Sequence, residues 1–212
     1  MRIDPVASYV LKAKKYQNRA FVAKREPFYF FEELVTTKNL YECAKTYNKL
    51  LHKRYTITLE NNIVFSFYFT VENFFHLLGL EKIGNINEFG GKSKRVIFKM
   101  LLNGTFPIKA IQNHKRYYRL KPRVDYFESL EKLLNKQHSK IVIEFNPELV
   151  ENTKLINTKY IFYAHERTGY THLTIAKRSR EYYPETFIYE NSKRYISEQN
   201  LLDVLDISIE PM

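Results

Sequence analysis

Residues 160–177 read YIFYAHERTGYTHLTIAK, and this stretch decides the class of fold. Apolar and polar side chains alternate on both sides of Thr168 and Gly169, which predicts two half-buried strands joined by a tight turn. If these two residues form the turn, His165 faces His172 directly across the hairpin. The face toward the core then carries Phe162, Ala164, Leu173 and Ile175. The opposite face carries Tyr163, His165, His172 and Thr174.

The paired histidines leave two interpretations of this second face open. It is either the wall of a cleft, in which the histidines take part in chemistry, or a wet surface of the sheet. A loop longer than two residues would shift the register and separate His165 from His172.

Strand patterns continue on both sides of this hairpin, and helical patterns precede them. Further strands are expected over residues 140–145, 186–190 and 204–209, and an earlier hairpin over 55–60 and 63–69, which turns at Asn61-Asn62. Helices are expected over residues 6–19, 40–53, 71–80, 93–102, 107–118 and 124–136. The expected helix caps and breaks are Asn39, Thr70, Gly79 or Gly84, and Asn103-Gly104.

The order of these elements predicts an α+β fold, with N-terminal helices and a β-hairpin, central basic helices, and a C-terminal antiparallel sheet. The chain has 212 residues and shows neither an internal repeat nor a linker. We therefore expect a single domain, in which residues 1–38 form a helical extension and residues 39–212 form the core.

The positive charge of the chain is concentrated in one segment. The whole sequence has 34 Lys and Arg against 23 Asp and Glu, a formal charge of +11, and residues 92–123 alone contain ten basic residues and no acidic one. A folded segment of this kind attracts polyanions, and its interleaved aromatic rings, including Tyr118, suit stacking on unpaired bases. A solvated basic face or an acidic lipid surface is the alternative. The expected nucleic-acid contacts are Lys92, Lys94, Arg95, Lys109, His114, Lys115, Arg116, Tyr117 and Arg119.

Several classes of protein are excluded by composition. The single Cys43 excludes a disulfide scaffold and a thiolate zinc cluster, and we expect it to be a core residue. No apolar run is long enough for a membrane span, and the N-terminus lacks a signal-peptide core. We therefore expect a cytoplasmic protein without a membrane partner. The adjacent Glu32 and Glu33 are interpreted as solvated surface charge.

The residues available for chemistry point to metal-independent cleavage of RNA. There is no P-loop, no dinucleotide-binding glycine pattern and no metal-ligand cluster, so no metal or cofactor is expected. The side chains that remain as candidates for catalysis are those of histidine, tyrosine, threonine and the basic residues. In such cleavage a base removes the ribose 2′-OH proton, an acid protonates the leaving 5′-oxygen, and a cation stabilises charge on the phosphate.

His76 is the third histidine of interest. It lies within the apolar segment NFFHLLGL over residues 73–80, and it is either a core histidine or a base whose pKa burial would lower. His52 and His138 are interpreted as surface residues at helix ends, and His114 as a contact residue.

The segments around His76 resemble a phage-associated branch of the Barnase–EndoU–colicin–RelE nucleases. In that branch a Phe-x-His-Leu-x-Gly-like helix follows the first strands, as FFHLLG does here over residues 74–79. An arginine that opens a later helix corresponds to Arg123 in KPRVDY, and a hydroxyl residue followed by tyrosine and glutamine corresponds to Thr186, Tyr195 and Gln199. Threonine stands where the family pattern has serine.

The resemblance implies helices packed on an antiparallel sheet and metal-free endonuclease activity, typically on RNA. It would make His76 the base or acid, Arg123 the cation at the phosphate, and Thr186 and Tyr195 the hydroxyl groups there. It also implies membership of toxin, phage-defence or mobile-element systems. The histidines at 165 and 172 lie outside the family pattern, and we keep them as additional catalytic candidates.

Three functional hypotheses follow from the sequence. The leading one is a metal-independent endoribonuclease that acts on RNA, tRNA being one candidate, as a toxin or phage-defence effector with an acidic antitoxin or immunity protein as its partner. The second is a non-catalytic nucleic-acid-binding protein of a mobile element or phage. The third is an interaction factor whose basic face binds an acidic protein. DNA stays open as a substrate, because contacts to phosphate do not identify the sugar.

Overall fold

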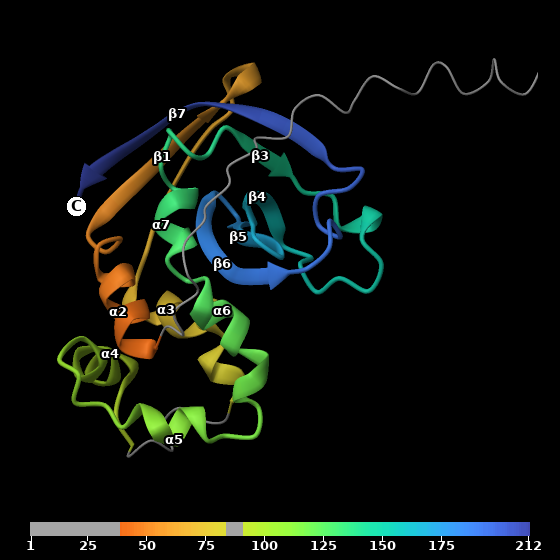
Figure 1. Ribbon diagram of the computed structural model, residues 1–212. Helices are drawn as coiled ribbons and strands as arrows, with labels where there is room; N and C mark the ends of the chain where they lie inside the picture. Colours follow the sequence, from red (N-terminus) through yellow and green to blue (C-terminus); the bar gives the residue numbers. More distant parts are fainter. Residues whose placement is uncertain (1–38, 84–90) are drawn as a thin grey trace, which may run out of the picture.

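The computed structural model of the chain describes residues 39–83 and 91–212 (Figure 1). The expected helix over residues 6–19, the adjacent carboxylates Glu32 and Glu33, and Gly84 lie outside these described residues. No helix of the described part is both long and apolar enough to cross a membrane.

Within the described residues, seven antiparallel strands form one sheet in the order β2-β1-β7-β3-β4-β5-β6. The strands are β1 (Lys53–Leu59), β2 (Val64–Tyr68), β3 (Ile141–Glu144), β4 (Thr158–Glu166), β5 (Gly169–Arg178), β6 (Glu181–Glu190) and β7 (Asn200–Pro211). The long strand β7 pairs with β1 along one part and with β3 along another. The early hairpin and the C-terminal strands therefore belong to the same sheet.

The sheet curves until its two edge strands, β2 and β6, approach each other (Figure 1). Phe65 of β2 stacks on Tyr160 of β4, with ring centroids 4.4 Å apart, and its centroid lies 5.0 Å from that of Tyr182 of β6. Offset and tilted ring contacts of this kind stabilise a core beyond the burial of apolar area. The three rings thus join the edges of a nearly closed sheet.

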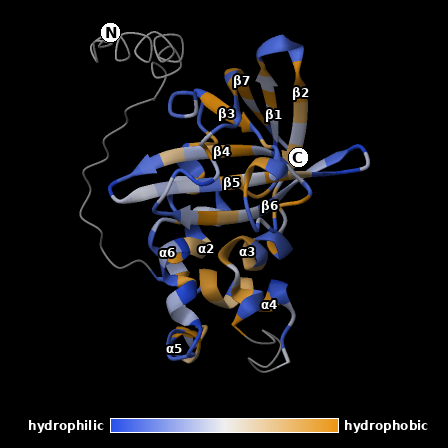
Figure 2. Cartoon of the chain, turned by 90° about the vertical axis from the view of Figure 1, so that its right-hand side faces the viewer, coloured by the Kyte–Doolittle hydropathy of each residue, from blue (hydrophilic) through white to orange (hydrophobic). Residues whose placement is uncertain are grey.

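Helices α2 to α6 lie below the sheet, with α4 and α5 farthest from it, whereas α7 lies at the level of the sheet and contacts β4 and β5 (Figures 1 and 2). The helices are α2 (Leu40–Asn48), α3 (Val71–Leu78), α4 (Lys94–Leu102), α5 (Ile108–Gln112), α6 (Lys121–Asp125) and α7 (Ser129–Leu133). Short 3₁₀ turns follow at η2 (Leu80–Lys82) and η4 (Tyr117–Arg119). The α+β class predicted from the sequence is confirmed in these broad terms.

Tyr47 is the centre of the main hydrophobic core between the helices and the sheet. Its fully buried ring contacts Phe69, Phe74, Phe98 and Phe127, with centroid separations of 5.3 to 6.2 Å. Its hydroxyl donates a 2.7 Å hydrogen bond to the carbonyl oxygen of Thr70. Because Thr70 is the N-cap of α3, this one side chain ties α2 to the first turn of α3.

A second, smaller core covers the opposite face of the sheet. It consists of Ile143, Phe145, Val150, Leu155, Ile161 and Tyr195. Five of these residues lie on or beside β3 and β4 or in the loop between them, and Tyr195 comes from the segment before β7. The sheet is therefore packed on both faces.

Several local predictions are confirmed. Asn39 and Thr70 cap their helices in capping boxes, and Gly79 ends α3 with φ 73°. Asn61 and Asn62 take positive φ at the hairpin turn, and Asn103-Gly104 ends α4. Cys43 is buried, as predicted.

The lengths of three helices are corrected. The helix expected over residues 40–53 ends at Asn48, because His52 takes φ 57° and the chain enters β1. The helix expected over residues 107–118 is confined to α5. The N–H of Arg116, which in a longer helix would donate to a backbone carbonyl, donates instead to the ring of His114. The helix expected over residues 124–136 is divided between α6 and α7.

The break between α6 and α7 has a structural reason at Tyr126. Its backbone leaves helical geometry, with φ −105° and ψ 9°. Its ring stacks in parallel on that of Tyr189 in β6, with centroids 4.5 Å apart. Packing against the sheet therefore outweighs the continuation of the helix.

The predicted pairing of His165 with His172 is wrong, although the predicted faces are right. Glu166 pairs with Gly169, so His165 faces Tyr170 and His172 faces Tyr163. The turn consists of Arg167 and Thr168 rather than of Thr168 and Gly169. This shifts the register by two residues, which keeps every side chain on its face but separates the two histidines.

Gly169 is required by its neighbour on β6, and this leads to a prediction. A Cβ atom at this position would lie 2.3 Å from the backbone oxygen of Glu190 and 2.9 Å from the Cα atom of Asn191. We expect Gly169→Ala to lower the free energy of unfolding by about 1–3 kcal/mol, because backbone atoms must move. Urea unfolding measures this change. Arg167→Ala, at an exposed position of the same turn, is the control and is expected to change it by less than about 0.5 kcal/mol; equal values for both variants would contradict the prediction.

Candidate active site

Helix α3 and the turn after it position the first part of the site. Thr70 begins the helix, and Gly79 ends it in the left-handed conformation. The buried residues Phe74, Phe75, Leu77 and Leu78 cover one side of the helix. His76 projects from the other side, and its side chain is 52% exposed. The interpretation of His76 as a core residue is therefore wrong.

His76 forms a pair with a carboxylate that the sequence analysis did not single out. Its Nδ1 lies 3.1 Å from Oε2 of Glu81, and the other oxygen of Glu81 accepts a hydrogen bond from Lys94 of α4. Burial raises the pKa of Glu81, but the hydrogen bonds and charges of Lys94 and His76 together lower it below its ordinary value. With Nδ1–H donating to the carboxylate, Nε2 of His76 is the nitrogen left to accept or donate a proton.

Arg123 of α6 extends to the C-terminal end of α3. Its Nη1 donates to the carbonyl oxygen of Leu77 at 3.1 Å and to Oγ1 of Thr186 at 3.3 Å. The last carbonyls of a helix lack partners within the helix and carry partial negative charge, which favours a cation there. Burial lowers the pKa of Arg123, and the nearby Tyr195 opposes this shift. The guanidinium nevertheless stays charged, because its ordinary pKa is far above neutrality.

Asp125, which lies two residues after Arg123 on the same helix, does not neutralise it. Asp125 pairs instead with Lys121. In the described part of the chain no carboxylate lies within ion-pair distance of the Arg123 guanidinium. The site thus holds a partly buried cation between two neutral oxygens.

Gly79 provides the space that Arg123 occupies. A Cβ atom at Gly79 would lie 3.2 Å from Nη1 of Arg123 and 3.2 Å from Cδ2 of Leu120. The glycine therefore has two roles, since it ends α3 at positive φ and lets the guanidinium approach the helix end.

Thr186 is held in place by a network of hydroxyl groups on β4, β5 and β6. Its N–H donates to Oγ1 of Thr174 at 3.0 Å. The hydroxyls of Thr158 and Thr174 both donate to Oε2 of Glu185, and the hydroxyl of Thr158 is the closer of the two. Because Oγ1 of Thr186 accepts from Arg123, its own hydroxyl proton is available to a further acceptor.

Tyr195 approaches this group from the segment between β6 and β7. Its ring packs against those of His172 and Phe145, with centroids 5.6 and 6.2 Å away. Burial raises the pKa of Tyr195, whereas the charges of Arg194 and Arg123 act to lower it. The segment is anchored by Gln199, whose side-chain amide accepts from the N–H of Asn146 and donates to its carbonyl, at 2.8 and 3.1 Å.

Of the other two candidate histidines, His172 contacts this group through the ring of Tyr195, whereas His165 contacts Tyr170. His165 is exposed, and its ring centroid lies 5.1 Å from that of Tyr170. His172 is completely buried, and neither ring nitrogen has a hydrogen-bond partner of ordinary geometry. Burial lowers the pKa of His172 to about 4, and the backbone of Ile188 opposes this shift only in part.

The predicted nucleic-acid contacts divide into paired and unpaired cations. Lys94 pairs with Glu81, and Arg95 with Glu72. The exposed residues Lys92, Lys109 and Lys115 form no ion pair with a described carboxylate.

Three further contact candidates are held by local interactions. Nδ1 of His114 accepts from the N–H of Arg116, whose Nη1 donates to the carbonyl oxygen of Lys82 at 3.3 Å. Nε of Arg119 donates to the hydroxyl of Tyr118 at 2.9 Å.

The two adjacent tyrosines differ in exposure. Tyr117 packs against the main core, whereas Tyr118 is 65% exposed and carries the guanidinium of Arg119 at 5.5 Å from its ring centroid. Of the two rings, Tyr118 is therefore the one available to stack on a base.

Lys82 and Lys154 add to the positive charge around Arg123, and the sequence analysis missed both. Burial lowers the pKa of Lys82, and the charges of Arg123 and Lys154 lower it further. Glu81 and Lys82 stand two and three positions after the helix-ending Gly79, and this short distance was a signal that the sequence contained. Lys154 carried no comparable signal. Over residues 39–83 and 91–212, no three His, Cys, Asp or Glu side chains gather in a way that could hold a metal ion.

Comparison with known proteins gives one match. The model of the family described as phage-Barnase-EndoU-ColicinE5/D-RelE like nuclease 4 matches residues 39–208. No curated protein and no solved structure matches the chain.

The buried His172 predicts a pH dependence of stability. Between its ordinary pKa of 6.5 and the folded value of about 4, the unfolded chain binds a proton that the folded chain does not. Stability therefore falls as the pH is lowered through this window, by about 3 kcal/mol between about pH 7 and pH 4. We expect His172→Leu to lack this part of the pH slope in urea unfolding. His165→Leu, on the same face but exposed, is expected to keep it; parallel slopes for wild type and His172→Leu would refute the prediction.

Proposed function

The chain belongs to the phage-associated Barnase–EndoU–colicin–RelE-like nucleases, and from this premise we propose that it is a metal-independent endoribonuclease. Family membership supports a nuclease. The cleavage of RNA, the independence of metal and a biological role as toxin or phage-defence effector are our proposal.

The observation that carries the proposal is the Arg123 guanidinium. A partly buried charge without a counter-ion is costly, and two neutral oxygens compensate it only in part. A phosphate would complete the compensation, because guanidinium groups bind phosphate oxygens in a bidentate manner. Arg123 is thus suited to bind the scissile phosphate and to stabilise the charge that develops on it.

The chemical step follows from the groups around this phosphate. Nε2 of His76 removes the proton from a ribose 2′-OH, and the 2′-oxygen attacks phosphorus. The bond from phosphorus to the 5′-oxygen breaks, the 5′-oxygen takes a proton from water, and a 2′,3′-cyclic phosphate is left. The carboxylate of Glu81 orients the His76 ring, so that Nε2 faces the substrate. Thr186 and Tyr195 donate hydrogen bonds to the phosphate oxygens.

The exposed cations before α4, on α5 and in the following turn would hold the rest of the RNA. Lys92, Lys109 and Lys115 are exposed and lie in the same continuous segment as Arg123. Tyr118 supplies an exposed ring for stacking. The same charge suits an acidic antitoxin or immunity protein, which would block the site by occupying this surface.

A non-catalytic nucleic-acid-binding protein is the second candidate. The observation in its favour is that these exposed cations lie before α4, on α5 and in the turn after α5, apart from α3 and η2, which carry His76 and Glu81, so that binding does not require an active site. Binding that survives loss of His76, without cleavage by the native protein, would identify this function.

Cleavage in the absence of free metal tests the proposal. Purified protein is incubated with total RNA and with tRNA in excess EDTA, and the ends of the products are analysed. We expect cleavage that leaves 2′,3′-cyclic phosphates, and a rate lowered by about 10²–10⁴ in His76→Ala. His52→Asn, at an exposed position with positive φ that asparagine tolerates, is the matched control and should cleave normally. A folded His76→Ala variant that cleaves at the native rate would exclude this role of His76.

The basic surface makes a separate prediction about salt. Replacing both Lys109 and Lys115 by Gln removes two contacts to phosphate, so that the slope of log affinity against log salt should become shallower by about 1.4 for single-stranded RNA. Fluorescence anisotropy with an uncleavable 2′-O-methyl oligonucleotide measures this slope. Lys45→Gln with Arg180→Gln removes the same charge from exposed positions elsewhere. An equal change in both double variants would mean that these lysines contribute only net charge.

A further inference from the structure

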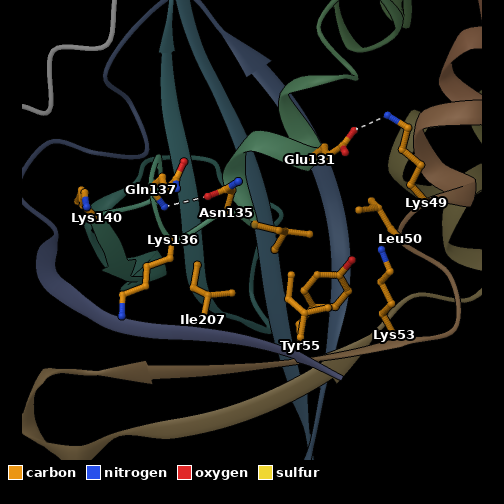
Figure 3. A pocket seen from close by; sticks show the side chains of 12 residues that line it. Lys49, Leu50, Lys53, Tyr55, Glu131, Asn135, Lys136, Gln137, Lys140 and Ile207 are labelled. Atoms are coloured by element: carbon orange, nitrogen blue, oxygen red, sulfur yellow. Dashed lines mark hydrogen bonds and ion pairs between the residues drawn. The ribbon is translucent and has the colours of Figure 1, made fainter. Parts of the chain in front are cut away.

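A pocket of about 570 Å³ lies away from the candidate active site (Figure 3). It is formed by the end of α2, the strands β1 and β7, and the segment from α7 to β3. None of His76, Arg123, Thr186 and Tyr195 lines it. Its volume is in the range of pockets that bind small organic molecules.

The floor of the pocket is apolar and its two ends are basic. Leu50, Tyr55, Leu134 and Ile207 are buried and form the floor, and Ile209 beside them is 48% exposed. Figure 3 shows Lys49 and Lys53 at one end and Lys136 and Lys140 at the other, with Tyr55 and Ile207 between them.

The two ends of the pocket have the same arrangement of charge. At each end one lysine pairs with a carboxylate: Lys49 with Glu131 at 3.0 Å, and Lys136 with Asp206 at 2.9 Å. The other lysine of each end, Lys53 or Lys140, has no described carboxylate within ion-pair distance. The pocket therefore offers one uncompensated cation at each end of an apolar floor.

We propose that this pocket binds an internal nucleotide of single-stranded RNA, with a phosphate at each end and the base on the apolar floor. A nucleotide within a strand has this pattern of charge, since a phosphate precedes it and another follows it. Lys53 and Lys140 would each bind one phosphate, and the side-chain amides of Asn135 and Gln137 in the lining can form hydrogen bonds with the edge of a base. Ile209 offers exposed apolar surface to its face.

The inference adds a second contact to the RNA substrate of the proposed function, but its test does not depend on cleavage. The probe is adenosine 3′,5′-bisphosphate, titrated into the full chain by calorimetry, with inorganic phosphate and adenosine as comparisons. We expect the bisphosphate to bind more tightly than either, and Lys53→Gln with Lys140→Gln to weaken it at least about tenfold. The control pair Lys45→Gln with Arg180→Gln has the same net charge and should bind as the native chain does.

Competition distinguishes a strand from a free nucleotide. An uncleavable 2′-O-methyl oligonucleotide should displace the bisphosphate from the native chain. The inference is overturned if the bisphosphate does not bind, if phosphate alone binds equally well, if both double variants lose affinity equally, or if the oligonucleotide fails to displace it. Because every ligand is uncleavable, these outcomes leave the role of His76 in cleavage to its own test.

Discussion

The guanidinium of Arg123 connects the parts of the molecule that form the candidate active site. It joins the end of α3, through the carbonyl oxygen of Leu77, to β6, through the hydroxyl of Thr186. A cation in this environment is tolerated because a helix end carries partial negative charge and a hydroxyl oxygen accepts a hydrogen bond. It is only partly compensated, however, since no described carboxylate pairs with it. Stability and the attraction of a phosphate therefore depend on the same side chain.

The surrounding structure determines where this cation can lie. Tyr47 ties α2 to the first turn of α3, and the aromatic rings around it hold the helix in the core. Gly79 ends the helix early enough to leave the carbonyl of Leu77 without a partner inside it, and lacks the Cβ atom that would obstruct Arg123. The rigid sheet then presents Thr186 from the other side. His76 acquires its carboxylate partner because the chain turns immediately after Gly79 and brings Glu81 back beside the ring.

The hairpin histidines, His165 and His172, and the helical His76 show which structural features a sequence pattern can predict. The alternation in β4 and β5 predicted the faces correctly, because a shift by two residues does not change the face, but it could not determine which residues pair. For His76 the helical period carried the information about exposure. With 3.6 residues per turn, the four apolar neighbours cover one side of the helix and leave His76 on the other. Local apolar composition suggested burial, whereas the period of the helix indicates exposure.

The sequence by itself determined the α+β class, the N-caps of α2 and α3, the ends of α3 and α4, the faces of the central hairpin, and the family of nucleases to which the residues around His76 point. These features depend on contacts between residues close together in the chain, or on a local pattern of charge and polarity. The tertiary structure alone decided that β7 joins the two groups of strands, that Arg123 lies between Leu77 and Thr186, and that four lysines surround one apolar pocket. Leu77 and Thr186 are 46 and 63 positions away from Arg123 in the sequence, and only the packing of the sheet against the helices brings the three residues together.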